Sequence, residues 1–541
     1  MQKGGNKMKK ILKFVTVILI VTSMTLNCFA AVGTQVNAKE LFVAPKAERV
    51  FYDILDGVVS GLVKGIAALM PTPAPWCESG SPDGFMAGTK EFLTEPAEDA
   101  AWHLGYDSRS ILPENKDEVI GRYYVAGTID VKGKLATAVE DDLKVRTVAI
   151  SDGADRETAI FCTIDAYGLA LSDVREIRTR LSQWSEENGI SSITVSVLHQ
   201  HSAVDTFGMN GNIWQMALLN PLFTAFGAET SNGKNPEFME NLFNKCTESI
   251  KSAESSMTKG TLYFGSIDAS EYIGDKRQPY INDPNFNRLR FVPENGTRET
   301  WIVTSSIHCV GNGAAGTVVT GDYPYYAEKV INDYGADVMF ILGAEECNNQ
   351  QRNESTVTDY RADASRIEEM KGYGDSIGKT ITDINNDKEI APLLNIRYRE
   401  IYLPVDNAIL LFAAKVGAFE NIVRKIDGKW NLMTEIGYME MGENMAFAIV
   451  PGELAPELAY GGCLTKDFSW SGKDWEYPSM QEIAGERDLY VLGLANDQIG
   501  YIVPDNDYMS MLHSDSKSIE FVSLGKTTAS RIVEEFALTV S

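Results

Sequence analysis

The sequence is short of basic residues and shorter still of histidine. Lysine and arginine number 49 against 75 aspartates and glutamates, which gives a net charge of −26 over 541 residues. That balance argues against binding nucleic acid through a basic patch. The seven cysteines form no Cys-x-x-Cys pair, which argues against a structural zinc knot, and there is no tandem repeat or low-complexity run. Five histidines remain, so any two that lie together deserve a chemical explanation.

A long membrane-spanning run is also missing. The apolar run Phe14–Leu26 follows Lys9, Lys10 and Lys13 and ends at Cys28-Phe29-Ala30. It is too short for a comfortable membrane span and has the layout of a secretory signal peptide. We therefore expect residues 1–30 to be a signal peptide and the protein to be secreted or extracellular; an uncleaved N-terminal anchor is the alternative.

Residues 31–120 are expected to form an N-terminal extension, and residues 121–541 one large catalytic domain. Within the extension, the apolar segment Phe51–Met70 ends at the breaker Pro71-Thr72-Pro73-Ala74-Pro75. It predicts an amphipathic helix that packs on the main domain or, less favoured, lies on a bilayer. Residues 76–120 are rich in Gly, Pro, Ser and acid and predict an irregular connection.

Regular α/β patterning is clear after residue 121. Two strand-like runs, Val145–Ile150 and Thr158–Ile164, are joined by the turn signal Ser151-Asp152-Gly153. A helical repeat of apolar residues follows and leads to the strand Ile193–Leu198, so strand, helix and strand predict a parallel unit. Later strands are expected at Trp301–Ile307, Val338–Leu342, Ile396–Leu403, Ala446–Val450 and Leu489–Leu494, and helices at Tyr325–Tyr334, Arg361–Ile381 and Thr527–Leu538.

Two histidines end the strand Ile193–Leu198. Side chains alternate along an extended chain, so His199 and His201 are expected to point the same way, just past the strand's carboxyl end. Open α/β sheets keep their ligands there, and imidazole is the commonest protein ligand of zinc. The alternative is a polar turn without a ligand.

Three further residues follow apolar strands. His308 comes directly after Trp301–Ile307, and Glu453 follows Ala446–Val450 and the breaker Pro451-Gly452. Tyr501 closes the run Ala495-Asn496-Asp497-Gln498-Ile499-Gly500. Their ordinary interpretations are a turn histidine, a helix cap and a packed aromatic ring.

Five motifs together resemble the neutral/alkaline (non-lysosomal) ceramidase family in order and approximate spacing, from about Gly121 to the end. They are His199-Gln200-His201-Ser202, the strand Trp301–Ile307 with His308, Gly321-Asp322-Tyr323-Pro324, Pro451-Gly452-Glu453, and Ala495–Tyr501. The resemblance implies a single zinc-hydrolase domain of α/β class, with mixed sheets and flanking helices.

The resemblance also implies an activity, which is zinc-dependent hydrolysis of the amide bond of an N-acyl lipid such as ceramide. In that case His199, His308, Glu453 and Tyr501 would bind Zn²⁺ and His201 would contact the substrate. Tyr501 could instead stabilise the oxyanion. The expected partner is a lipid or other small-molecule substrate; peripheral contact with a membrane and the oligomeric state stay open.

The sequence departs from the family at informative positions. Gln200 replaces the threonine of the first motif, and Asn349 stands where ceramidases carry a serine important for activity. The C-terminal β-sandwich of full ceramidases is expected to be absent. These departures leave two alternatives open: an amidase or esterase acting on another substrate, and a non-catalytic binding protein on the same fold.

Overall fold

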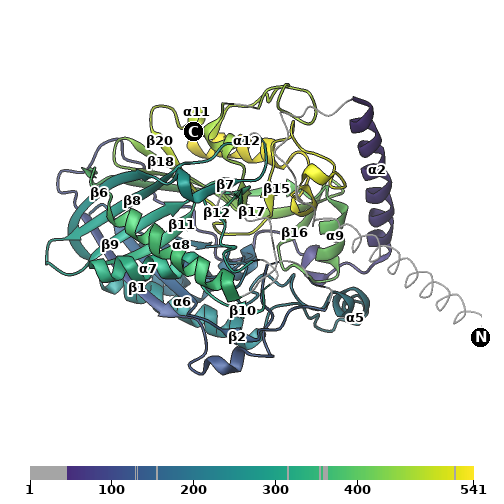
Figure 1. Ribbon diagram of the computed structural model, residues 1–541, viewed down its shortest axis with the longest axis horizontal. Helices are drawn as coiled ribbons and strands as arrows, with labels where there is room; N and C mark the ends of the chain where they lie inside the picture. The colour runs from purple at the N-terminus through teal and green to yellow at the C-terminus, as the bar shows by residue number, and fades with distance from the viewer. Residues whose placement is uncertain are drawn as a thin grey trace, which may run out of the picture.

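The computed structural model describes residues 46–541 except 128–129, 131, 154–155, 279, 314–315, 353–354, 357–363, 463 and 517–518. Two β-sheets form the centre of the molecule and helices cover their outer faces (Figure 1). The signal peptide predicted for residues 1–30 lies outside the described residues and stays a prediction. No helix in the described part of the chain is both long and apolar enough to cross a membrane.

The larger sheet has nine strands in the order β11-β9-β8-β6-β1-β3-β4-β5, with β14 beside β6. Adjacent strands of this sheet run antiparallel except for two parallel pairs, β4 with β5 and β9 with β11. The strands are β1 (Trp102–Ser110), β3 (Lys144–Ser151), β4 (Thr158–Ile164), β5 (Ile190–Val197), β6 (Thr258–Asp268), β8 (Asn285–Pro293), β9 (Glu299–Ser305), β11 (Ala336–Leu342) and β14 (Lys388–Glu389).

The smaller sheet has five strands in the order β15-β17-β18-β20, with β16 beside β17. Here β18 and β20 are the parallel pair. The strands are β15 (Leu394–Pro404), β16 (Val423–Ile426), β17 (Lys429–Met441), β18 (Met445–Ile449) and β20 (Asp488–Leu492). Short ladders join β2 (Ala138–Val139) to β10 (Val318–Val319), β12 (Asn348–Arg352) to β7 (Ile273–Asp275) and β13 (Ser355–Thr356), and β19 (Glu453–Leu454) to β21 (Tyr501–Ile502).

The two sheets pack face to face because their strands are apolar on both sides. In β4, Ile160 and Cys162 belong to the core under the helices, whereas Ala159 and Phe161 belong to the core between the sheets, where Phe447 and Ile449 of β18 meet them. Strands buried on both faces read as continuous apolar runs, as β4 does. The result is a helix, sheet, sheet, helix sandwich.

Helices seal both outer faces. The larger sheet is covered by α3 (Leu171–Arg180), α6 (Pro236–Ser255), α7 (Asp322–Tyr334) and α8 (Ala364–Thr382), and the smaller sheet by α10 (Pro456–Tyr460), α11 (Met480–Ala484) and α12 (Thr528–Val540). The short helix α4 (Ser182–Glu187) follows α3. At one end of the molecule α2 (Lys46–Leu69) lies beside α9 (Ala408–Lys415), with α5 (Ile213–Phe226) nearby (Figure 1).

The predicted fold class is confirmed, as are the 145–164 hairpin, the parallel unit that leads to β5 and every later strand and helix named from the sequence, within a few residues. The apolar segment after Phe51 is helical and packs on α9 through Val63 and Ile66. The interpretation of residues 76–120 as an irregular connection is wrong for residues 102–110, which form β1 between β3 and β6. Glycine, serine and charged residues in that strand hid a β-pattern that only its neighbours stabilise.

Candidate metal centre

The candidate site lies where the carboxyl ends of the three parallel strand pairs meet. His199 follows β5, His308 follows β9, and Glu453 follows β18. The chain after β20 links the two sheets: the Gly493 N–H donates to Leu342 O at 2.8 Å and the Asn496 N–H donates to Val195 O at 2.7 Å. This crossing brings residues about 250 positions apart to a common point.

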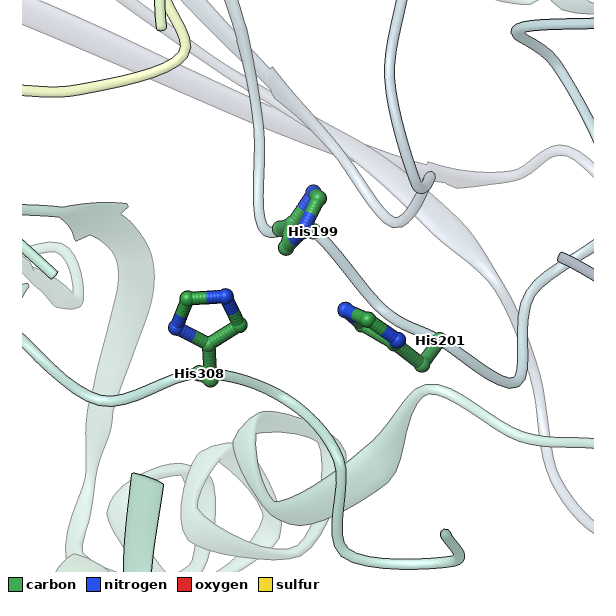
Figure 2. A group of neighbouring side chains, drawn as sticks. All are labelled: His199, His201 and His308. Atoms are coloured by element: carbon green, nitrogen blue, oxygen red, sulfur yellow. The ribbon is translucent and has the colours of Figure 1, made fainter. Parts of the chain in front are cut away.

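The three histidines lie together in space (Figure 2). Their ring centroids are 4.7 Å apart for His199 and His201, 5.1 Å for His199 and His308, and 5.8 Å for His201 and His308. One carboxylate oxygen, Oε2 of Glu453, lies 3.1 Å from His308 Nε2 and 3.5 Å from His199 Nε2. The structure therefore brings together the side chains that the sequence separates.

The route by which His199 reaches this cluster differs from the expected one. Strand β5 ends at Val197, and His199 has a left-handed backbone with φ of +56°. The expectation that alternation along an extended chain aligns the two imidazoles is therefore wrong, although the rings do lie side by side. A non-glycine residue at positive φ is strained, and such strain concentrates at functional sites.

Backbone carbonyls hold two of the imidazoles. His199 Nδ1 lies 2.7 Å from Tyr167 O, and His308 Nδ1 lies 2.9 Å from Glu345 O. A ring that donates its Nδ1–H to a carbonyl keeps the Nε2 lone pair available, which is the usual arrangement of a metal-binding histidine. Both Nε2 atoms then face the Glu453 carboxylate.

Tyr501 and Asn349 also come from elements at this site. Tyr501 pairs with Glu453 across the β19 and β21 ladder, and its ring lies 6.4 Å from that of His308 at an angle of 28°. Asn349 is buried in β12, next to Asn348, whose carbonyl accepts the His308 backbone N–H at 2.9 Å.

His201 is the third imidazole of the cluster, and its ring makes the fewest polar contacts of the three. Neither ring nitrogen has a hydrogen-bond partner among the described residues, although both atoms are buried. The ring meets Tyr167 edge to face at 5.1 Å, while the backbone N–H donates to Cys309 O. Both nitrogens are therefore free to contact a ligand or a water molecule.

Three contact residues were not singled out from the sequence. Tyr167 stacks on His199 with ring centroids 4.4 Å apart, the Glu345 carboxylate contacts His308 Nδ1, and Gln498 Nε2 donates to Glu453 Oε1 at 3.1 Å. Tyr167 follows β4 and Glu345 follows β11, the parallel partners of the strands that precede the histidines. Searching the strand next to each histidine strand would have found both.

The electrostatics of the cluster favour a cation. Burial lowers the pKa of His199, and burial with the neighbouring His199 and His308 lowers that of His201 further. Burial acts on His308 in the same direction, but Glu345 and Glu453 outweigh it and raise its pKa to about 10. Burial opposes ionisation of Glu453, yet His199 and His308 leave its pKa below the usual value. The two buried carboxylates beside His308 therefore stabilise a positive charge at this position.

The donor set fits a transition-metal ion. His199, His201 and His308 form one group whose ligand atoms lie within 4.8 Å of one another, and His308, Glu345 and Glu453 form a second. Imidazole nitrogens with a carboxylate oxygen are typical ligands of a catalytic zinc site, which keeps a position open. The anchored Nδ1 atoms supply the support that such ligands have around bound metals.

An apolar pocket adjoins the histidines. It encloses about 650 Å³ of empty space, part of it open to solvent, and Tyr167, Glu453 and Gln498 line its polar part. The rest of its wall is apolar, with Phe207, Met209, Val405, Leu410, Leu411, Phe419, Leu432 and Ile499 among the lining residues. Pockets of this composition hold apolar ligands with a few fixed polar contacts.

No protein-family model and no curated protein matches the sequence. Among the solved structures that match the fold are two ceramidases. Neutral ceramidase from Pseudomonas aeruginosa aligns with a TM-score of 0.59 at 14% identity, covering 82% of this chain and 74% of its own. A ceramidase complexed with C2 aligns with a TM-score of 0.60 at 13% identity, covering 82% of this chain and 75% of its own. At such identities the likeness establishes the architecture and not the activity: the chain has the fold of the neutral ceramidases.

Proposed function

We propose that this protein is a secreted zinc-dependent hydrolase that cleaves the amide bond of an N-acyl lipid of the ceramide type. The observation that carries the proposal is the pair of anchored imidazoles, His199 and His308, whose Nε2 atoms both face the Glu453 carboxylate. The shared fold with neutral ceramidases supports the same chemistry.

In this proposal His199, His308, Glu453 and Tyr501 hold the zinc ion. When bound, zinc supplies Lewis acidity that polarises a carbonyl oxygen and makes water a better nucleophile at neutral pH. Glu345 and the Tyr167 carbonyl keep the two imidazoles in place. Without the ion, burial and the nearby carboxylates of Glu453 and Glu345 hold the pKa of Tyr501 well above its usual range, so the phenol keeps its proton.

His201 is proposed as the group that exchanges a proton with the substrate. Its low pKa keeps the imidazole neutral, and its unpartnered nitrogens can accept a proton from the attacking water or hydrogen-bond the scissile amide. General acid–base catalysis of this kind contributes roughly 10²- to 10⁴-fold. The neutral amide of Asn349 replaces the family serine in β12.

The substrate class is proposed from the pocket. Its polar part includes Glu453, where the amide would be held, and its apolar wall suits an acyl or sphingoid chain. Burying such a chain gains about 0.8 kcal/mol for each methylene group, which favours a lipid over a short polar amide.

The test combines elemental analysis with an N-acylsphingosine assay. We expect about one zinc per chain and hydrolysis of ceramide, and we expect His199→Ala to lose both. His103→Ala, in β1 of the larger sheet, is the matched control and should retain both the metal and the activity. Gentle purification that gives active protein without metal would refute the zinc assignment.

A substrate panel separates the alternatives. Hydrolysis of short N-acyl compounds or esters without hydrolysis of ceramide would move the assignment to another amidase or esterase. If the natural protein cleaves nothing and Asn349→Ser gains ceramide hydrolysis, the natural protein is a binding protein.

A further inference from the structure

The helix α5 is unusual for a surface helix because it carries no charged side chain. It runs Ile213–Phe226, starts at the cap Asn212 and ends at Gly227, which has a left-handed backbone. Met216 and Ala217 are buried, while Leu219, Leu222 and Phe226 project outward at helical spacing and are 42%, 49% and 86% exposed. Exposed apolar clusters of this kind mark interaction sites.

The helix α2 has an apolar outer face as well. Its inner side is fixed, since Arg49 Nη1 donates to Trp470 O at 3.0 Å and Lys415 Nζ donates to Ala67 O at 2.9 Å. Opposite those contacts lie the exposed side chains Phe51, Ile54, Val58, Leu62 and Leu69, the last of them 81% exposed. The helix is thus firmly attached and presents a second apolar face to solvent.

Helix α9 packs against α2 and α5 and also forms part of the pocket wall. Met70, just past α2, packs with Met216 of α5, and Phe412 of α9 packs against the same cluster. Leu410 and Leu411 of α9 line the pocket. The helices α2 and α5 therefore lie beside an element that forms part of the pocket wall. Figure 1 shows the three helices at one end of the molecule.

We propose that the outer faces of α2 and α5 dock on the surface of a lipid bilayer with electrically neutral headgroups. The inference rests on the proposed function, because an N-acyl lipid resides in a bilayer and must pass from it to the pocket. The whole-chain charge of −26 disfavours anionic lipid, so apolar insertion provides the attraction. A second copy of the chain would also cover these faces, but it would not explain why both helices pack against α9, which forms part of the pocket wall.

The test measures co-sedimentation with phosphatidylcholine vesicles that contain no substrate. We expect the full chain to bind. One double variant combines Leu222→Ser with Phe226→Ser, and the other combines Ile54→Ser with Val58→Ser. The partition coefficient of each onto the vesicles should fall by about tenfold or more. The matched control, Leu538→Ser with Ile120→Ser, removes comparable exposed apolar side chains outside α2 and α5. It should bind as the natural chain does. Adding phosphatidylserine should weaken binding at low ionic strength.

Hydrolysis of a short-chain, water-soluble N-acyl substrate separates this inference from the proposed function. Both double variants should keep that activity and their melting temperature while losing activity on vesicle-borne ceramide. Vesicle binding unchanged in both, or absent in the natural chain, overturns docking on a bilayer. Conversion from dimer to monomer in the variants, with vesicle binding intact, would assign the faces to a second copy. Absence of soluble-substrate hydrolysis in every protein, with vesicle binding as expected, would overturn the proposed function alone.

Discussion

At the scale of single residues, the candidate centre depends on groups that hold the imidazoles. His308 is held on its Nδ1 side by both the carbonyl and the carboxylate of Glu345, and on its Nε2 side by Glu453. A carboxylate behind a metal-binding histidine fixes the ring and raises its basicity. Glu345 is therefore expected to affect metal binding without being a ligand.

We predict that Glu345→Gln weakens zinc affinity by about 10- to 100-fold, because the ring loses its charged partner. Competition with a chelator at equilibrium measures the change. The neighbouring Glu346→Gln is the control: burial raises the pKa of Glu346 well above its usual value, which favours the neutral carboxyl that glutamine resembles. Equal zinc affinity in the two variants would contradict the role given to Glu345.

Asp497 gives a prediction of pH dependence. Burial raises its pKa to about 7, although the Leu171 and Gln498 N–H groups and the Asn421 amide donate to Oδ1. The folded state binds this proton more tightly than the unfolded state, so its stabilising contribution is complete below about pH 4 and is lost as the pH rises through about 7. Asp497→Asn should reduce the fall in unfolding free energy between pH 5.5 and 8 by on the order of 1–2 kcal/mol, as urea denaturation would measure. An unchanged slope would show that Asp497 titrates normally.

At the scale of elements, the segment between β20 and β21 assembles the site. It crosses from the smaller sheet to the larger, and its last glycine, Gly500, has a φ of +86°. The Gly500 carbonyl accepts the Glu453 N–H at 3.2 Å, and a Cβ at Gly500 would meet Val522 O at 1.8 Å. Only glycine fits this passage beside the proposed ligands.

We predict that Gly500→Ala lowers the unfolding free energy by about 2–4 kcal/mol and also weakens zinc binding, because the strand that carries Tyr501 must shift. Gly57→Ala, in α2, is the control, since nothing lies within 4 Å of its Cβ position. That change should stabilise the protein by about 0.5–1 kcal/mol. Urea denaturation of both variants measures the difference, and equal effects would refute the steric argument.

At the scale of the whole molecule, buried charge links the layers. Glu435 of β17, in the smaller sheet, is 2.7 Å from Arg175 Nη2 and 2.9 Å from Arg178 Nη1, both in α3, which covers the larger sheet. All three side chains are buried. Removing one member of such a group leaves uncompensated charge in the interior.

We predict that Glu435→Leu lowers the unfolding free energy by about 3–5 kcal/mol, because buried Arg178 loses its carboxylate partner and buried Arg175 is left with Glu400. At an exposed position, Glu240→Leu removes one of the two carboxylate partners that Arg180, also in α3, has in the described part of the chain. This change should cost less than about 1 kcal/mol. Thermal and urea unfolding compare the two. A similar small loss in both variants would mean that the layers are held by apolar packing alone.

The sequence by itself determined the local features. The apolar run of β4, the β-branched residues of β5, the hairpin turn and the helical spacing before β5 specify their elements through neighbouring residues alone. His199, His308 and Glu453 are recognisable because each follows a strand of this kind. Tertiary structure decided the rest. Strand β1 is stable only between its neighbours, the left-handed turn at His199 depends on its surroundings, and Glu345 reaches His308 only because β11 pairs with β9. These contacts join residues whose positions in the chain say nothing of their distance, because they form only when the two sheets pack and their parallel strands end at one place.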